Sequence, residues 1–235
     1  MKIRADRPAK FDAAYVPRVF EFTLPRRGEL AAGETRSVSC GPLAGSSASP
    51  GAEGGVALAA EVFARAERAD APDAPTPLVV AIGDAVRRGF PTAARATVLS
   101  RAALEDDARP TDGQVGGTLA RRLATFADAV CLRAPASAGD ARAATPDLVV
   151  VLEPDAVTIV RAPELSELSP RELLRALGRR FDPSGLGGAA LVVGPAASAA
   201  FAGLTAGELG EGDVPTSFVG RSGLGARAAA LGLRA

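Results

Sequence analysis

The sequence predicts a mixed fold of β-strands and α-helices, arranged as one domain with two related halves. Short apolar segments such as residues 78–82 and 189–193 end at Gly83 and Gly194, as buried strands do before a turn. Segments with helical signals are fewer and lie between these strands. Similar features follow one another in the same order in both parts of the chain, which indicates an internal duplication.

The duplication is clearest at two short motifs that recur at nearly equal separation. Pro91-Thr92 corresponds to Pro215-Thr216, and Arg95 corresponds to Arg221. A duplicated unit of this kind would give two similar binding loops in one domain. The predicted boundaries are 1–17 for a flexible leader, about 18–133 for the first half and about 147–235 for the second.

The first half is predicted to open with a hairpin. Residues 19–24 alternate apolar and polar side chains like a half-buried strand, and 25–30, with Gly28 in the turn, lead into a second short strand. After a loop rich in Gly, Ser, Ala and Pro, an Ala-rich amphipathic stretch predicts a helix over 56–69. The later elements are a linker at 70–77, strands at 78–82, 96–99 and 129–132, and a helix at 118–126 after Gly116-Gly117.

The second half is predicted to open in the same way. Strands at 148–152 and 157–161 flank a turn that contains Asp155. Ser169 and Pro170 then form a helix start, because Ser caps the first turn and Pro suits the first helical position. The remaining elements are that helix, to about residue 180, a strand at 189–193, the Gly-rich motif at 220–225 and an Ala-rich tail.

The side-chain inventory excludes several classes of site. The chain of 235 residues has no His and two Cys, Cys40 and Cys131, which lie far apart. An iron–sulfur cluster, a structural zinc site and an imidazole-based catalytic triad therefore cannot be built from this chain alone. We assign no catalytic residue and no metal ligand. The remaining chemistry is binding by Arg, acidic and hydroxyl side chains and by backbone amides.

Charge and hydropathy restrict the partners and the location. The chain has 27 basic and 27 acidic residues, so it has no strong field to attract nucleic acid or an anionic membrane. No apolar run reaches the length of a membrane span, and the first residues lack the apolar segment of a signal peptide. Two isolated Cys fit a reducing compartment. We therefore expect a cytoplasmic protein without nucleic-acid or membrane partners.

Gly220-Arg221-Ser222-Gly223-Leu224-Gly225 is the sharpest candidate binding motif. Three Gly around an Arg let a ligand approach the backbone, and amides before a helix together with a guanidinium group suit a phosphate. The alternative is a tight loop that packs on the core and leaves Arg221 on the surface. The motif matches neither the P-loop nor the dinucleotide-binding fingerprint.

A second group of candidates lies in the first half. If the duplication is real, Arg95 and Arg221 occupy equivalent places, and the two Arg could clamp a ligand with two similar anionic ends. The alternatives are a chance resemblance between two αβ units and a solvated strand residue at Arg95. Thr111-Asp112-Gly113-Gln114, followed by Gly116-Gly117, precedes a predicted helix and could bind a phosphate or a cation. The alternative for this segment is an ordinary Asp/Gly turn. The acidic group Glu105-Asp106-Asp107 has the character of an exposed loop.

Several short sequence motifs, taken in order, resemble the N-terminal domain of the tungsten-dependent aldehyde ferredoxin oxidoreductase family. The closest are Val193-Gly194-Pro195-Ala196 and Gly220-Arg221-Ser222-Gly223-Leu224-Gly225-Ala226. The resemblance covers about residues 18–235. The other similar phrases are 18–24 with 28–30, 55–58, 79–83, 91–95 and 126–130.

The resemblance implies an α+β fold with two related halves that contacts the phosphates of a tungsten- or molybdenum-bis-pterin cofactor. It implies a cofactor-binding domain or subunit of an aldehyde:ferredoxin-type oxidoreductase that acts on an aldehyde or oxo group and is not a complete enzyme alone. A separately encoded chain would carry the cluster cysteines and share the cofactor. The cofactor-binding residues implied are Arg95, Thr111, Asp112, Gly113, Gly220, Arg221, Ser222, Gly223 and Gly225.

Two departures from the family pattern keep alternatives open. The family's Asn-Ser-Gly-Gly phrase appears here as residues 111–114, where Asp112 would repel a phosphate unless a cation bridged them. The tail at 228–235 lacks the family's polar Ser-Lys-Asn phrase. One alternative is a degenerate, cofactor-free binding or scaffold domain on the same fold. The other is a small enzyme that acts through Asp or Glu on a different ligand.

Overall fold

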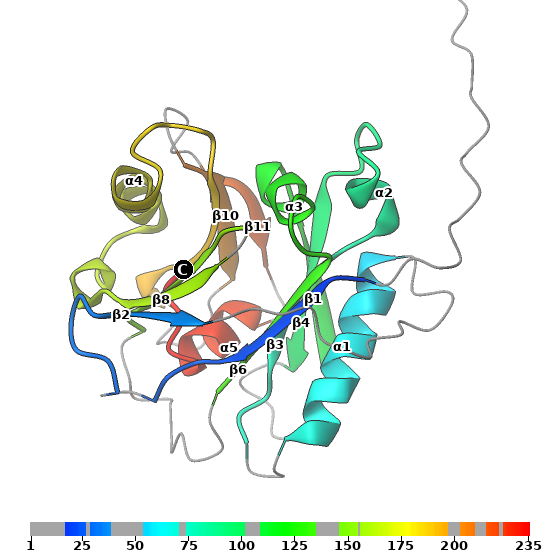
Figure 1. Cartoon of the computed structure of the whole chain (residues 1–235), viewed down its shortest axis with the longest axis horizontal. Helices are drawn as coiled ribbons and strands as arrows, with labels where there is room; N and C mark the ends of the chain where they lie inside the picture. The colour runs from blue at the N-terminus through cyan, green and yellow to red at the C-terminus, as the bar shows by residue number, and fades with distance from the viewer. Residues whose placement is uncertain are drawn as a thin grey trace, which may run out of the picture.

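The structure is a computed structural model of the 235-residue chain. It describes residues 17–26, 29–38, 54–70, 74–101, 109–134, 146–154, 156–196, 203–209, 215–220 and 223–235. No helix within these ranges is long and apolar enough to cross a membrane. The described part is an α+β arrangement of three sheets with helices against them (Figure 1).

A five-stranded mixed sheet forms the larger part of the fold. Its strands lie in the order β1-β6-β3-β4-β5, in which β1 runs parallel to β6 and the other neighbours are antiparallel. Apolar strands that are buried on both faces, such as β3 and β6, occupy the centre. The strands are β1 (Val19–Thr23), β3 (Leu78–Ile82), β4 (Arg95–Arg101), β5 (Pro110–Gly116) and β6 (Ala129–Arg133).

Helix α1 (Gly55–Ala69) covers one face of this sheet, where Leu58, Val62 and Phe63 pack on apolar side chains of β3, β4 and β6. These residues recur at helical spacing, so one stripe of α1 is buried and the rest faces solvent. Two shorter helices, α2 (Asp84–Arg87) and α3 (Thr118–Leu123), follow β3 and β5.

Two three-stranded antiparallel sheets lie on the other side, with orders β2-β8-β7 and β11-β10-β9. Helix α4 packs its buried leucines against β9 and β10, and α5 contacts β4, β5 and β9. Figure 1 shows α1 and α4 at opposite ends of the molecule. The elements are β2 (Thr35–Val38), β7 (Leu148–Leu152), β8 (Val157–Arg161), α4 (Pro170–Phe181), β9 (Ala189–Val193), β10 (Leu204–Glu208), β11 (Pro215–Val219) and α5 (Leu224–Ala230).

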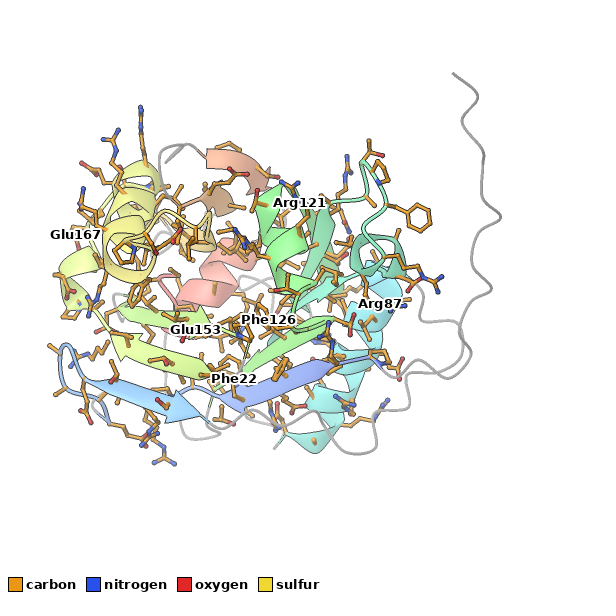
Figure 2. The ribbon with its side chains drawn as sticks, turned by 45° about the horizontal axis from the view of Figure 1, so that its top comes forward. Phe22, Arg87, Arg121, Phe126, Glu153 and Glu167 are labelled. Atoms are coloured by element: carbon orange, nitrogen blue, oxygen red, sulfur yellow. The ribbon has the colours of Figure 1, made fainter. Side chains whose placement is uncertain are left out.

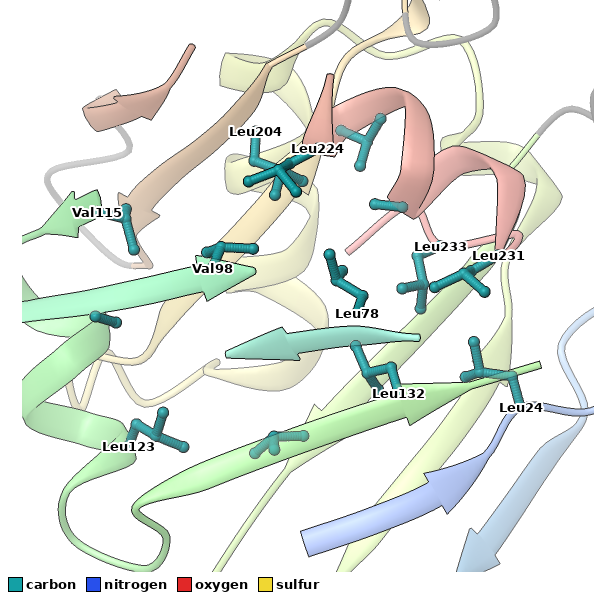
Figure 3. Close-up of a cluster of buried hydrophobic side chains, with 14 of the residues drawn as sticks. Leu24, Leu78, Val98, Val115, Leu123, Leu132, Leu204, Leu224, Leu231 and Leu233 are labelled. Atoms are coloured by element: carbon teal, nitrogen blue, oxygen red, sulfur yellow. The ribbon is translucent and has the colours of Figure 1, made fainter. Parts of the chain in front are cut away.

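The largest apolar cluster joins the sheets. Leu78 and Leu132 from the five-stranded sheet lie in one cluster with Leu204, Leu224 and Leu233 from the later part of the chain (Figure 3). Because a single cluster draws on both parts, the described chain shares one core.

Several local predictions are confirmed, and two are wrong. The hairpin of β7 and β8 forms as predicted. The predicted opening hairpin does not, because β1 pairs in parallel with β6 whereas β2 pairs with β8. Residues 111–114 lie within β5 and are not a turn. The sequence also gave no signal for β2, α2 and β10, which are short or have no amphipathic pattern.

The cap at the start of helix α4 should contribute to the stability of the fold. Ser169 caps the helix: its hydroxyl accepts from the Glu172 amide, and its own amide donates to the Glu172 carboxylate. The hydroxyl and amide hydrogen bonds from Ser169 also lower the pKa of Glu172. Ser169→Ala should lower the free energy of unfolding by about 1 kcal/mol. Thermal unfolding checks this, with exposed Ser184→Ala as the control; equal midpoints for the two variants would contradict it.

Candidate functional site

The candidate site is built on a seam between two edge strands. β5 is the last strand of the five-stranded sheet, and β11 lies against it. The Gly116 amide donates a hydrogen bond to the Ser217 hydroxyl at 3.1 Å. Farther along, Gly113 lies so close to Val219 that a Cβ atom at Gly113 would overlap the Val219 Cγ1 atom. We call this contact between β5 and β11 the β5–β11 seam.

The seam brings two of the predicted motifs together. A Cβ atom at Gly113 would lie 3.6 Å from Cδ1 of Leu224, so β5 meets the beginning of α5 as well as the end of β11. The motif at 111–114 and the motif at 220–225 are therefore neighbours in space. Their sequence separation gave no sign of this, since the contact depends on how the sheets pack.

The residues of β5 divide between two faces. Side chains alternate along a strand, so Asp112 and Gln114 share one face while Thr111 and Gly113 share the other. Gln114 Nε2 donates to Thr97 Oγ1 at 2.9 Å. A Cβ atom at Gly55 would lie 3.1 Å from that same Oγ1, which places this face on the side covered by α1. The carboxylate of Asp112 therefore lies on the opposite face from the contact with β11.

Arg95 lies at the beginning of β4 and is exposed. Its guanidinium group makes no hydrogen bond or ion pair with any other described residue. Register pairs Arg95 with Gly116, so it is next to the end of the seam where Ser217 lies. By contrast, Arg101 at the far end of β4 is engaged, because its Nε and Nη2 atoms hold both carboxylate oxygens of Glu67 at 2.6 and 2.9 Å.

The turn before Arg95 holds an unusual backbone. Thr92 has a φ of 66°, in the left-handed region that β-branched residues rarely adopt. The turn is held by hydrogen bonds from the Arg95 amide to the Ala93 carbonyl and from the Gly117 amide to the Ala94 carbonyl. Strained residues of this kind often occur at functional sites. The sequence could not have indicated this feature, since Thr is not a residue expected at that φ.

The structure places part of the motif at 220–225. Gly220 is exposed, and a Cβ atom there would meet nothing within 4 Å. Gly223 has a φ of 66° and directly precedes α5, while Gly225 is buried within that helix. Arg221 and Ser222 lie outside the described residues.

Arg95 and Gly220 lie toward opposite ends of the β5–β11 seam. Gly116, the register partner of Arg95, donates to Ser217, whereas Val219, which directly precedes Gly220, is next to Gly113. Three residues of extended chain from Ser217 to Gly220 span about 10 Å. Among the described residues, Arg95 and the open backbone of Gly220 therefore lie apart and do not meet at one point.

The other sequence candidates do not form a reactive centre within the described ranges. Cys131 is buried, and burial raises the pKa of its thiol to about 12, which keeps it protonated and unreactive. Nor do the described residues contain a group of three or more acidic or Cys side chains suited to a metal ion. Arg87 and Arg88 pair with Asp84. Cys40 and residues 105–107 lie outside the described ranges.

The chain belongs to the aldehyde ferredoxin oxidoreductase N-terminal domain family. The family description "Aldehyde ferredoxin oxidoreductase, N-terminal domain" matches residues 35–235. This confirms the predicted family, and the three-sheet α+β architecture agrees with the predicted fold.

One solved structure similar to this chain is described as the active site complex BamBC of benzoyl coenzyme A reductase in complex with 1,5 dienoyl-CoA. The TM-score is 0.61 at 18% sequence identity, and the match covers 77% of this chain and 25% of that chain. At this identity the likeness shows the fold, and our chain spans about a quarter of the length of its neighbour. No curated protein sequence matches the chain.

The described residues offer groups suited to binding a phosphate at the two ends of the β5–β11 seam, but not at its middle. The exposed guanidinium of Arg95 can donate two hydrogen bonds to a phosphate, and the open backbone at Gly220 leaves room for close approach. The carboxylate of Asp112, between these ends along β5, would repel an anion on its own face.

Proposed function

We propose that this chain is the phosphate-binding part of a tungsten- or molybdenum-bis-pterin site in an aldehyde:ferredoxin-type oxidoreductase. The observation that carries the proposal is the β5–β11 seam, with Arg95, whose guanidinium has no partner among the described residues, toward one end and the open backbone of Gly220 toward the other. Anion-binding groups at two separate places suit a ligand with two phosphate ends better than a single phosphate. Family membership supports the cofactor class.

In this proposal the chain binds and orients the metal–pterin cofactor, and it does not carry out the reaction alone. When bound, the metal–pterin group would supply the redox chemistry at an aldehyde or oxo substrate. Arg95 and Arg221 would hold one phosphate end each, and Gly220 and Gly223 would allow close approach to the backbone. Gly113, beside Val219, and Gly225, buried within α5, would instead let the strands and the helix that carry the site pack closely. Thr111 and Ser222 would contribute polar groups beside the phosphates, whereas Asp112 would need a bridging cation to do so.

A separately encoded chain would complete the enzyme in the cytoplasm. This chain has two Cys, too few for the four thiolates of a usual cluster, so the electron-transfer cluster would come from the partner. The multi-chain complex that contains the structural neighbour is in keeping with a split arrangement. Purification from the native host should yield near-stoichiometric tungsten or molybdenum, by mass spectrometry, with a co-purifying cluster-bearing chain.

Replacing Arg95 should reduce cofactor retention without unfolding the domain. Since its exposed guanidinium has no partner among the described residues, Arg95→Ala should leave the thermal midpoint within about 2 °C. Loss of a charge-assisted contact should weaken cofactor binding about tenfold or more. Metal per chain is the measurement. Arg36→Ala, an exposed Arg on β2 away from the seam, is the control. Equal metal content in Arg95→Ala and Arg36→Ala would count against the proposal. Equal metal content in Arg221→Ala and Arg36→Ala would also count against it.

A specific residue favours a second candidate function, a cofactor-free binding or scaffold domain. Asp112 places a negative charge on β5 where the family motif has an uncharged Ser. If the cofactor binds despite this charge, Asp112→Asn should increase metal retention because the repulsion is removed. Folded wild-type protein that carries no metal, together with an unchanged Asp112→Asn variant, would favour the cofactor-free domain.

A further inference from the structure

A second, unassigned feature lies away from the seam: a cavity of about 390 Å³ between the sheets. Its walls come from β3 and β6 of the five-stranded sheet, from α3, and from β7 and β9 on the other side. This volume is in the range of pockets that hold small organic ligands. Most of the lining is aliphatic, with Leu78, Val80, Leu132, Val150, Leu152 and Leu191 as central members.

The cavity leaves apolar side chains incompletely covered at positions where a core would normally bury them. Val80 lies at the middle of the central strand β3, and it is partly exposed although its four strand neighbours are buried. Val150 and Leu152 on β7 and Leu191 on β9 are likewise only partly buried. Protein interiors are usually close-packed, so an occupant that covers these side chains would gain apolar contact area.

The charged side chains among the described residues that line the cavity are two carboxylates, Glu153 and Asp182, and one guanidinium, Arg122. Phe126 and Glu153 both line the cavity and lie near one another in Figure 2. Arg122 also lines it, but its Nε donates to the Gly187 carbonyl at 2.8 Å, so part of its guanidinium is already used. Asp182 accepts from the amides of Gly188 and Leu186 at 2.8 and 2.9 Å, which lowers its pKa and keeps it ionised.

We propose that this cavity binds a neutral amphiphile, with an apolar chain inside and an uncharged hydroxyl-type end at the mouth. The aliphatic walls select the apolar body. Among the described lining residues, two carboxylates against one guanidinium disfavour an anionic end group. Arg122 already donates to the Gly187 and Leu186 carbonyls, and both Asp182 oxygens already accept from backbone amides, so these groups favour a neutral end group over a charged one. None of these residues belongs to the seam, so the inference does not depend on cofactor binding.

The test uses the full chain with N-phenyl-1-naphthylamine, a neutral probe that fluoresces in apolar sites. We expect saturable binding at one site, with displacement by hexanol, octanol and decanol. Each methylene that enters the cavity should tighten binding about fourfold until the cavity is full. Decanoate should displace the probe at least tenfold less well than decanol. Equal displacement by decanoate, or no dependence on chain length, would overturn the proposal.

Filling the cavity gives an independent test. Val80→Phe directs added volume into the cavity from β3 and keeps a residue favourable to strands. It should reduce probe affinity at least tenfold, and Val150→Phe should do the same from the opposite wall. Val56→Phe, at a position 46% exposed on α1, should bind the probe like the wild type. Folded cavity-filling variants with unchanged probe binding would show that the probe binds elsewhere and would refute the proposal.

Discussion

Arg234→Ala should lower the free energy of unfolding by about 3 kcal/mol. The Arg234 side chain is fully buried, and its Nε donates to the Leu165 carbonyl at 3.0 Å. Its two Nη atoms donate to the carbonyls of Val193 and Leu168. Burial lowers the pKa of this guanidinium, and nearby Glu167 opposes that effect.

Two opposing effects decide whether Arg234→Ala raises or lowers the free energy of unfolding. Removing Arg234 relieves the cost of burying a charge, but it takes a hydrogen-bond donor from three carbonyl groups, of which Leu165 still accepts from the Leu168 amide, and it leaves a cavity the size of a long side chain. For a domain of this size, about 3 kcal/mol corresponds to a fall of about 6–12 °C in the thermal midpoint. Arg234→Met, which fills the space but donates nothing, should recover part of the loss. A midpoint within 2 °C of wild type for the Ala variant would contradict the assignment.

Gly113→Ala should separate the β5–β11 seam and lower the free energy of unfolding by about 1–3 kcal/mol. A Cβ atom at this position would overlap Val219, whose side chain is buried and β-branched and cannot easily turn away. In an ordinary strand the same change would be stabilising, because Gly is the more flexible residue in the unfolded chain. A loss of stability therefore reports the close approach of the two strands.

The matched control is Gly220→Ala, where the added methyl group meets nothing within 4 Å. Its free energy of unfolding should stay within about 0.5 kcal/mol of wild type. The double variant Gly113→Ala with Val219→Ala should lose less stability than the sum of the single changes, because the clash is removed. Additive losses would mean that Gly113 and Val219 do not touch.

Local elements were predictable because their signals are local. The apolar run of β3 and the hairpin of β7 and β8 depend on short-range patterning and on a turn between neighbouring strands. The helix start at Ser169 and Pro170 was predicted from local residue types, and the structure confirms Ser169 as the cap of α4. These predictions needed no knowledge of distant partners.

Pairings between distant segments were not predictable from the same signals. β1 looked like the first strand of a hairpin, but it pairs in parallel with β6, and β2 joins β8 instead. Asp112 and Gly113 are typical turn residues, yet they lie in β5 because the edge strand meets β11 there and Gly113 leaves room for Val219. Tertiary packing overrode the local preference.

The family, the mixed α+β character and the lack of His were evident from the residues alone, and so were the candidates Arg95 and the motif at 220–225. The meeting of β5 and β11, the position of Asp112 on the opposite face from that contact, and the apolar cavity between the sheets became visible in the folded chain. The physical reason is that residue type and spacing are written along the chain, whereas these features arise where segments far apart in sequence pack together.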